Sequence, residues 1–411
     1  MLRRIKVYAG PYPGHRKGTA PPESSTPTLS TRRLGEPMPE RPMAAKGLED
    51  VVLGDSAITL VAGETGGLAY RGFNIADLVP KATYEGVVGL LLDGEAPRVD
   101  PPPDITAELH RRRQLDELAS ARADAVPLGL APLEALRSLL SLQGGPAWPY
   151  PPSRSQGLEL IAKTPTLLAR YIRRSRGEDP SPDRPDLGHA AHYLYQLSGM
   201  VPSPERARAL EQYLVMLADH GMNASTFALR IVISTQSDLI SAAVAALGAL
   251  KGPAHGGAPA KVSDMLDGVG APENAERWVD AALARKERLY GFGHRAYKTD
   301  DPRAVQLKRI AASIAEPGRF ALAEAVERAG VAALQRKRPE ARLFMNVEFY
   351  GAVVLEAVGL PRELFTPTFA VARTAGWAAH ALEQAADNRL IRPDLRYVGP
   401  APGLRWPPAA G

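Results

Sequence analysis

Residues 237–252 read SDLISAAVAALGALKG, and the chain continues through GPAHGGAP at 252–259. Apolar residues of the first stretch recur at i, i+3 and i+4, which is typical of a helix with a buried face. Its longest nearly apolar run, LISAAVAALGAL, is too short for a membrane span, which needs about 20 residues. The stretch therefore predicts a buried helix that ends in an irregular turn carrying His255.

Helical spacing recurs along most of the chain. It is present in TYEGVVGLLLDG (83–94), PLEALRSLLSL (132–142), GLELIAKTPTLLARYIRR (157–174), PERARALEQYLVMLADH (204–220), ENAERWVDAALARKE (273–287), ERAGVAALQRK (327–337), EFYGAVVLEAVG (348–359) and PTFAVARTAGWAAHALEQAAD (367–387). Only AITLVAG (57–63) and GLAYRG (67–72) indicate strands, joined by a glycine-rich turn. We therefore predict an all-α fold with a small N-terminal β-hairpin.

Composition limits the class of protein. The chain has 411 residues, 45% of them hydrophobic, so it can bury one large core or two modest ones. It has no cysteine, which suits a reducing compartment, and we expect a cytoplasmic protein. Residues 1–45 hold eight Lys and Arg against three Asp and Glu, which accounts for the whole net charge of +5. The remainder is balanced, and we expect neither a nucleic-acid nor a membrane partner.

The first residues differ in character from the rest. Residues 1–46 are rich in Pro, Ser, Thr, Gly and Arg and lack hydrophobic periodicity, so we interpret them as a disordered basic tail. The basic start MLRRIK leaves a targeting peptide as an alternative, although AGPYPG (9–14) would break an amphipathic helix. Translation from Met38 or Met43 is a second alternative.

Three histidines lie beside glycine in irregular stretches: His220 in LADHGMNAST, His255 in GPAHGGAP and His294 in LYGFGHRAYKTDDPRA. Backbone N–H groups at a helix start favour neutral imidazole, which can donate a hydrogen bond to a developing oxyanion. The third stretch adds Lys298 and Arg303, which suit an anionic ligand. We therefore predict an anion site. Structural loop histidines remain the alternative, and a zinc site is disfavoured by the surrounding cations and the lack of HExxH spacing.

Several stretches resemble motifs of the citrate synthase family, and they occur in the same order along the chain as in that family. LADHGMNASTFALR, GALKGPAHGGAP, YGFGHRAYKTDDPRA, NVEFY and FAVARTAGWAAHALEQ match its motifs, and GLEDVVLGDSAITLVAGETGGLAYRGFNIADL resembles its opening. The similarity runs from about Gly47 to Pro400 and is greatest to the short prokaryotic form. It implies a multi-helical homodimer with a large domain at 47–257 and 360–405, and a small domain at 258–359 that closes over the substrates.

The resemblance implies an enzyme of the acyltransferase type that acts in the tricarboxylic acid cycle. It would condense acetyl-CoA with oxaloacetate, hydrolyse citryl-CoA to citrate and CoA, and need no cofactor and no metal, since acetyl-CoA is a substrate. A 2-methylcitrate synthase using propionyl-CoA is one alternative. A non-catalytic paralogue that binds CoA or a dicarboxylate is another.

The resemblance also implies a role for each matching residue. His255 would stabilise the enol, His294 would polarise the keto oxygen of oxaloacetate, and Glu348 would take the proton from the acyl methyl group. Oxaloacetate would be held by His220, Asn223, Arg303, Arg373 and, across the dimer interface, Arg392. CoA would lie against Arg288, Leu289, Tyr290, Gly291, Phe292 and Lys298.

Glu348 is where the chain departs from the family, whose motif reads Asn-Val-Asp where this chain has NVEFY. The carboxylate is kept on a side chain longer by one methylene, about 1.5 Å of reach. We expect Glu348 to be the base. The alternative is that it only begins a helix, where an acidic residue is favoured by the dipole.

Overall fold

The structure, a computed structural model, describes residues 46–48, 51–256, 258–293, 297, 299, 301–337 and 344–399. Nearly all of the predicted tail and two predicted site residues, His294 and Lys298, lie outside the described residues. Gly54–Leu395 form one compact unit. The described residues that precede and follow it in sequence belong to a second unit, which contains the short 3-10 helix η1 (Lys46–Leu48).

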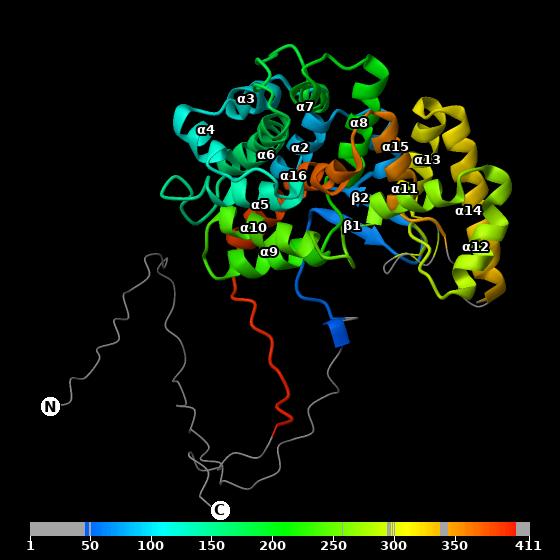
Figure 1. Cartoon of the computed structure of the whole chain (residues 1–411). Helices are drawn as coiled ribbons and strands as arrows, with labels where there is room; N and C mark the ends of the chain where they lie inside the picture. The colour runs from blue at the N-terminus through cyan, green and yellow to red at the C-terminus, as the bar shows by residue number, and fades with distance from the viewer. Residues whose placement is uncertain are drawn as a thin grey trace, which may run out of the picture. The chain divides into compact units, whose positions relative to one another are not determined.

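Helices dominate the compact unit, which confirms the predicted all-α class (Figure 1). They are α1 (Ile75–Leu78), α2 (Tyr84–Asp93), α3 (Pro103–Arg113), α4 (Glu117–Asp124), α5 (Pro132–Ser141), α6 (Arg154–Ser175), α7 (His189–Ser198), α8 (Pro204–Leu217), α9 (Ala224–Ser234), α10 (Leu239–Leu250), α11 (Ala258–Val269), α12 (Ala275–Ala284), α13 (Pro302–Ile314), α14 (Pro317–Lys337), α15 (Val347–Ala357) and α16 (Phe365–Ala386), with 3-10 helices η2 (Pro272–Asn274) and η3 (Arg362–Leu364). Among the described helices, none combines the length and hydropathy needed to cross a bilayer.

Capping residues explain where several helices begin and end. Thr83 caps α2 by accepting a hydrogen bond from the Gly86 N–H, and Gly94 ends the same helix in the left-handed conformation at φ 85°. Ser153 and Gln156 form a reciprocal capping box at the start of α6. These capping residues bound the helices close to the points where the apolar periodicity of the sequence begins and ends.

The predicted hairpin is confirmed and is extended by a third strand. β1 (Thr59–Ala62), β2 (Gly67–Tyr70) and β3 (Phe73–Asn74) form an antiparallel sheet in sequence order, with Thr59 opposite Tyr70. The buried Tyr70 hydroxyl lies 2.9 Å from the carbonyl oxygens of both Met216 and Asp219. The sheet is thereby fixed against the turn that carries His220.

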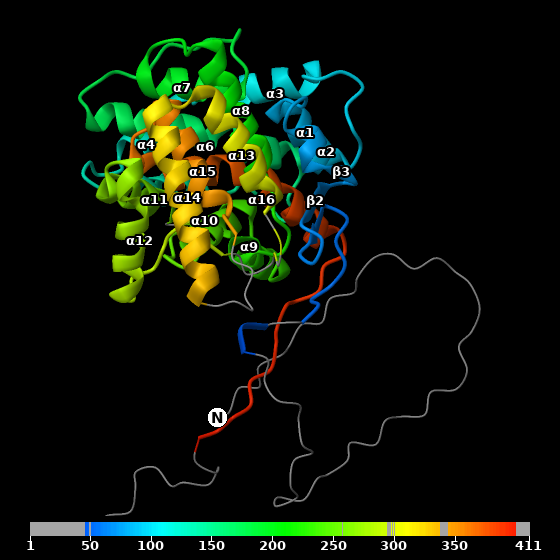
Figure 2. The same ribbon diagram turned by 90° about the vertical axis from the view of Figure 1, so that its right-hand side faces the viewer.

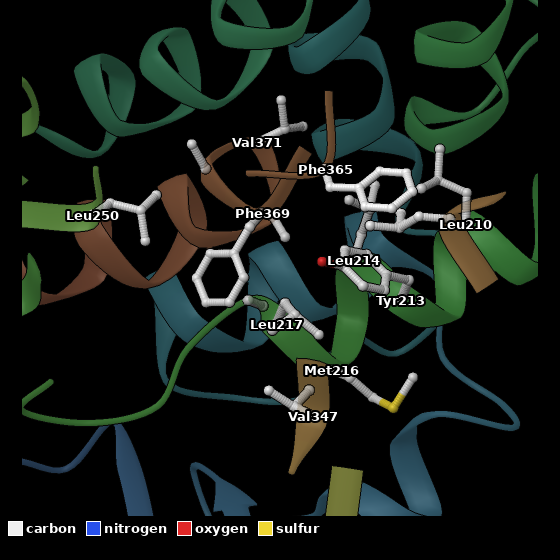
Figure 3. Packing of buried hydrophobic residues seen from close by; sticks show 14 of the residues in the cluster. Leu210, Tyr213, Leu214, Met216, Leu217, Leu250, Val347, Phe365, Phe369 and Val371 are labelled. Carbon is white, nitrogen blue, oxygen red and sulfur yellow. The ribbon is translucent and has the colours of Figure 1, made fainter. Parts of the chain in front are cut away.

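Helix α16 forms the centre of the core. It packs against α2, α6, α8, α9 and α10, and most of its residues are buried, as expected for an enclosed helix. In Figure 3, Phe365 and Phe369 of α16 lie beside Tyr213, Leu214 and Leu217 of α8. Polar residues on this helix are therefore held in a dry, rigid setting.

Helices α11 to α15 pack against one another on one side of the unit (Figures 1 and 2). Of these, α13 and α15 also contact α8. The starts of α13 and α15 carry Arg303 and Glu348, so this contact brings two predicted site residues toward the core. The division into a large and a small domain stays a prediction.

Candidate active site

His255 lies in the turn after α10, half-buried, with its backbone N–H donating to the Gly252 carbonyl over 2.9 Å. The Ser225 backbone N–H donates to Nε2 of the ring over 3.3 Å. A backbone N–H can only donate, so Nε2 is unprotonated and the ring proton is on Nδ1. Burial, assisted by the charge of Arg373, lowers the pKa of His255 to about 4. The ring is therefore a neutral donor at physiological pH.

The start of α9 supports this ring. The Ser225 hydroxyl lies 3.0 Å from Nε2 of His255 and 2.7 Å from Oδ1 of Asn223. It has one proton, so it donates a hydrogen bond to only one of these two acceptors at a time. The Trp377 indole N–H donates to the same hydroxyl over 3.3 Å. Neither Ser225 nor Trp377 was singled out from sequence, although both lie inside the quoted motifs.

Asn223 acts as a helix cap. Its Oδ1 accepts from the N–H groups of Ser225 (3.1 Å) and Thr226 (3.2 Å), and its Nδ2 donates to the Gly221 carbonyl over 3.1 Å. These contacts place Ser225 beneath His255. A direct contact of Asn223 with substrate stays a prediction.

His220 lies in the turn between α8 and α9, directly after the fully buried Asp219. Its Nε2 is 3.1 Å from the hydroxyl of Tyr297, and the two rings meet edge to face at 5.6 Å. Tyr297 belongs to the same sequence stretch as His294 and Lys298. The contact therefore joins the first and third histidine stretches, as the anion-site hypothesis requires.

Arg303 lies in the first turn of α13 and is almost fully buried together with its partner Asp301. The guanidinium binds the carboxylate in a two-point arrangement, with Nε 3.0 Å from Oδ1 and Nη2 2.8 Å from Oδ2. Asp301 also caps the helix by accepting from the Arg303 N–H over 3.0 Å. The charge of Arg303 is thus held at a fixed position.

Arg373 of α16 is 1% exposed. Its Nε donates to the Leu217 carbonyl over 2.7 Å, and its Cζ lies 4.7 Å from the centre of the Phe369 ring. Its Nη2 has no hydrogen-bond partner among the described residues. Burial lowers the pKa of this guanidinium, and a buried donor without an acceptor costs free energy. A bound carboxylate would remove that cost.

Glu348 lies in the first turn of α15, where its backbone N–H donates to the capping Asn346 Oδ1 over 3.0 Å. Its side chain is half-buried, and burial raises the pKa of the carboxyl to about 7 against the opposing charges of Arg288 and Arg303. A carboxyl group that titrates near neutrality suits a general base. Glu348 therefore begins a helix and also has the electrostatics of a catalytic group.

The segment before His294 pairs with the segment before Glu348. Phe292 forms an antiparallel bridge with Met345, and the N–H of Asn346 donates to the Gly291 carbonyl over 2.9 Å. Gly291 has φ 82°, and a Cβ there would lie 2.7 Å from Cβ of Phe349. This close approach places part of the predicted CoA segment beside the predicted base.

Other residues of that segment differ in exposure. Leu289 is buried in the core, whereas Arg288 is exposed, with its Cζ 5.5 Å from the centre of the Tyr290 ring. His294 and Lys298 lie outside the described residues, so their positions relative to this segment stay predictions.

Arg392 is not brought to the other site residues within the subunit. It is exposed, and the N–H of the preceding Ile391 donates to Oγ of Ser234 over 3.0 Å. Ser234 ends α9, whereas Ser225 near its start contacts His255. Nine residues of helix separate the two ends by about 14 Å.

Arg303 and Arg373 link the remaining residues electrostatically. Each lowers the pKa of the buried Tyr213, although burial dominates and raises it. Arg373 acts on His255 and Arg303 acts on Glu348. In the described parts of the chain, His, Asp and Glu form no group of three or more that could hold a metal ion. The arrangement can therefore combine a neutral donor, a base and two cations for an anionic substrate.

Known proteins show the same combination of sequence and fold. Residues 47–394 match the family described as citrate synthase, C-terminal domain. Citrate synthase of Deinococcus radiodurans is 39% identical over 365 residues, 86% of this chain and 96% of that protein. The 2-methylcitrate synthase of Mycobacterium tuberculosis is 36% identical over 397 residues, 93% of this chain and 97% of that protein.

A solved structure is also similar. Citrate synthase from Thermoplasma acidophilum, in a ternary complex with carboxymethyl coenzyme A and oxaloacetate, has a TM-score of 0.78 at 29% identity, covering 87% of this chain and 96% of that chain. Fold and site define an enzyme of the acyltransferase type. The chain belongs to the citrate synthase family.

Proposed function

We propose that the protein is a citrate synthase that condenses acetyl-CoA with oxaloacetate and hydrolyses citryl-CoA to citrate and CoA. The observation that carries this proposal is the setting of two groups. The Ser225 N–H fixes the Nδ1–H tautomer of His255, whose pKa burial lowers to about 4, and burial raises the pKa of Glu348 to about 7. One is a neutral hydrogen-bond donor and the other a base near neutrality, the two groups that enolisation of a thioester requires.

The first half of the reaction follows from these groups. Glu348 takes a proton from the methyl carbon, and the electron pair moves onto the thioester oxygen, where the Nδ1–H of His255 donates. The enol carbon then attacks the keto carbon of oxaloacetate. The keto oxygen becomes an alkoxide and takes up a proton, with His294 as the proposed donor. Water then cleaves the thioester to release CoA.

Oxaloacetate carries two carboxylates, and the site offers cations for both. Nη2 of the buried Arg373 has no hydrogen-bond partner among the described residues, which supports a direct ion pair. The charge of Arg303 acts on Tyr297, whose hydroxyl lies 3.1 Å from Nε2 of His220. The exposure of Arg392 and its distance from its own His255 support its donation to the site of a second subunit in a homodimer. We place this dimer in the cytoplasm and assign it no cofactor.

A 2-methylcitrate synthase is a second candidate, favoured by the 36% identity to such an enzyme and by Glu348, whose longer side chain replaces the family aspartate. One methylene changes binding by about 1–3 kcal/mol, so the two acyl groups are separable by kinetics.

Thiol release by the purified protein, with oxaloacetate and either acetyl-CoA or propionyl-CoA, tests both candidates. A higher kcat/KM for acetyl-CoA supports citrate synthase, and a higher value for propionyl-CoA supports the alternative. Release of no thiol from either would contradict both and favour a non-catalytic paralogue.

A further inference from the structure

A buried guanidinium that the proposed reaction does not use lies in the middle of α9. Arg230 is 5% exposed. Its Nε and Nη2 lie 3.0 and 2.7 Å from Nδ1 of His380, its Nη1 donates to Oε1 of Gln384 over 3.2 Å, and its Nη2 pairs with the Glu383 carboxylate. All three partners belong to α16. Arg230 therefore fixes three side chains of the central helix at once.

One arm of this network leads to His220. A guanidinium only donates, so Nδ1 of His380 accepts and the ring proton is on Nε2. That nitrogen faces Oδ2 of Asp219 at 3.3 Å, and the same oxygen accepts from the Gly221 N–H over 2.8 Å. Asp219 and Gly221 flank His220 in sequence. The orientation of the turn thus depends on the tautomer of His380, which Arg230 selects.

A second arm leads to Arg392. Nε2 of Gln384 donates to Oδ1 of Asn388 over 3.2 Å, and Nδ2 of Asn388 donates to the Ser234 carbonyl over 3.2 Å. The Ser234 hydroxyl accepts from the N–H of Ile391, the residue before Arg392. The chain leaving α16 is thereby tied down up to the residue that presents this arginine.

We propose that Arg230 and His380 are positioning residues that set two parts of the active site from one buried guanidinium, the His220 turn and the segment carrying Arg392. A buried ion pair adds little net stability compared with apolar packing, but a fully hydrogen-bonded one holds a definite geometry. The inference rests on the proposed function for its substrate, oxaloacetate, whereas the network itself is independent of that function.

The first arm is tested by His380→Leu and His380→Gln, because glutamine keeps one acceptor for Arg230 and one donor for Asp219. We expect His380→Leu to weaken oxaloacetate binding by about tenfold in calorimetry and His380→Gln to recover most of it. The KM for acyl-CoA should change far less. Tyr171→Phe, which removes a 2.9 Å hydrogen bond to the Leu130 carbonyl, is the matched control for loss of a buried polar contact.

Double-mutant cycles separate positioning from stability. If His380 acts through His220, His380→Leu should add little to the loss caused by His220→Ala. If Gln384 acts through Arg392, Gln384→Leu should add little to Arg392→Ala. Fully additive effects, or a lowered Tm with unchanged oxaloacetate affinity, would overturn the proposal. Should His380→Leu not fold, Gln384→Leu with Arg392→Ala still tests the second arm, and the tautomer of His380 in the unaltered protein tests the first.

A further readout keeps this inference separate from the proposed function. In nitrogen-15 spectra of histidine-labelled protein, His380 should show the Nε2–H tautomer, and the His220 signals should shift in His380→Leu and return in His380→Gln. An Nδ1–H tautomer or unmoved His220 signals would refute the network even in an active enzyme. Shifted signals in a protein that releases no thiol would refute only the proposed function.

Discussion

The Ser225 backbone N–H donates to Nε2 of His255, and this contact decides which ring nitrogen carries the proton. Because α9 begins at Ala224 with Asn223 as its cap, the donor is a fixed part of a helix terminus. The proton is left on Nδ1, the nitrogen that does not contact Ser225. The tautomer of His255 thus depends on secondary structure.

Removal of His255 should abolish the stabilisation of the enol oxygen. We expect His255→Ala to lower kcat by about 100- to 1000-fold, the usual cost of losing one oxyanion donor. Oxaloacetate binding, measured by calorimetry, should be retained. Turnover close to that of the wild type would mean that another group donates to this oxygen.

The pH dependence of kcat/KM should report Glu348. The base acts as a carboxylate, and its pKa is about 7, so kcat/KM should fall about tenfold for each pH unit well below that value. The pKa of His255, about 4, is too low to produce this change. A profile flat from pH 5 to pH 8 would contradict the assignment.

Substitutions at Glu348 separate charge from shape. Glu348→Gln keeps the shape and removes the base, so condensation should be lost while oxaloacetate still binds. Glu348→Asp restores the family residue and should retain or raise activity. A Glu348→Gln protein that condenses acyl-CoA at the wild-type rate would show that Glu348 is not the base.

The substitution Glu348→Gln should also stabilise the fold at alkaline pH. The pKa of Glu348 is raised from 4.5 to about 7, so the folded state binds the proton more tightly, and this stabilising effect is lost as the pH rises from about 4.5 through 7. At pH 8, Glu348→Gln should therefore increase the free energy of unfolding by up to about 3 kcal/mol. Equal denaturation midpoints at pH 8 would place the carboxyl in water.

A site shared between subunits predicts complementation. A mixture of Arg392→Ala and His255→Ala proteins forms heterodimers in which one of the two sites is intact. At equal amounts and with full exchange, the activity should recover to roughly a quarter of the wild type. No recovery after demonstrated subunit exchange would show that Arg392 does not act across the interface.

Gly291 offers a test of the pairing beside Glu348. Both Gly291 (φ 82°) and Gly129 (φ 91°) have left-handed backbones, but only at Gly291 would a Cβ collide, with Phe349. Gly129→Ala should cost about 1 kcal/mol, and Gly291→Ala should cost more and raise the KM for acyl-CoA. Equal effects on stability and KM would argue against the close approach.

Features that depend on neighbouring residues could be predicted from the sequence, whereas contacts between residues far apart in the sequence could not. Helical periodicity is local, and the expected helices and hairpin are present, with β3 missed because two residues leave no pattern. His380 reads as an ordinary helix residue, since its partners Asp219 and Arg230 lie about 150 residues away in sequence. Asn223 caps α9, a role that was not predicted from the sequence, and its contact with substrate stays a prediction.

The pairing of residues 291–293 with residues 344–346 restricts how the two segments can move. Backbone hydrogen bonds join these two segments, so any hinge movement must carry residues 291–293 and the helix bearing Glu348 together. If CoA lies against residues 288–292 as proposed, we expect the distance between Glu348 and the acyl methyl carbon to be set before any closure. Closure would then act on the approach of oxaloacetate, and not on the distance between the base and the proton that it removes.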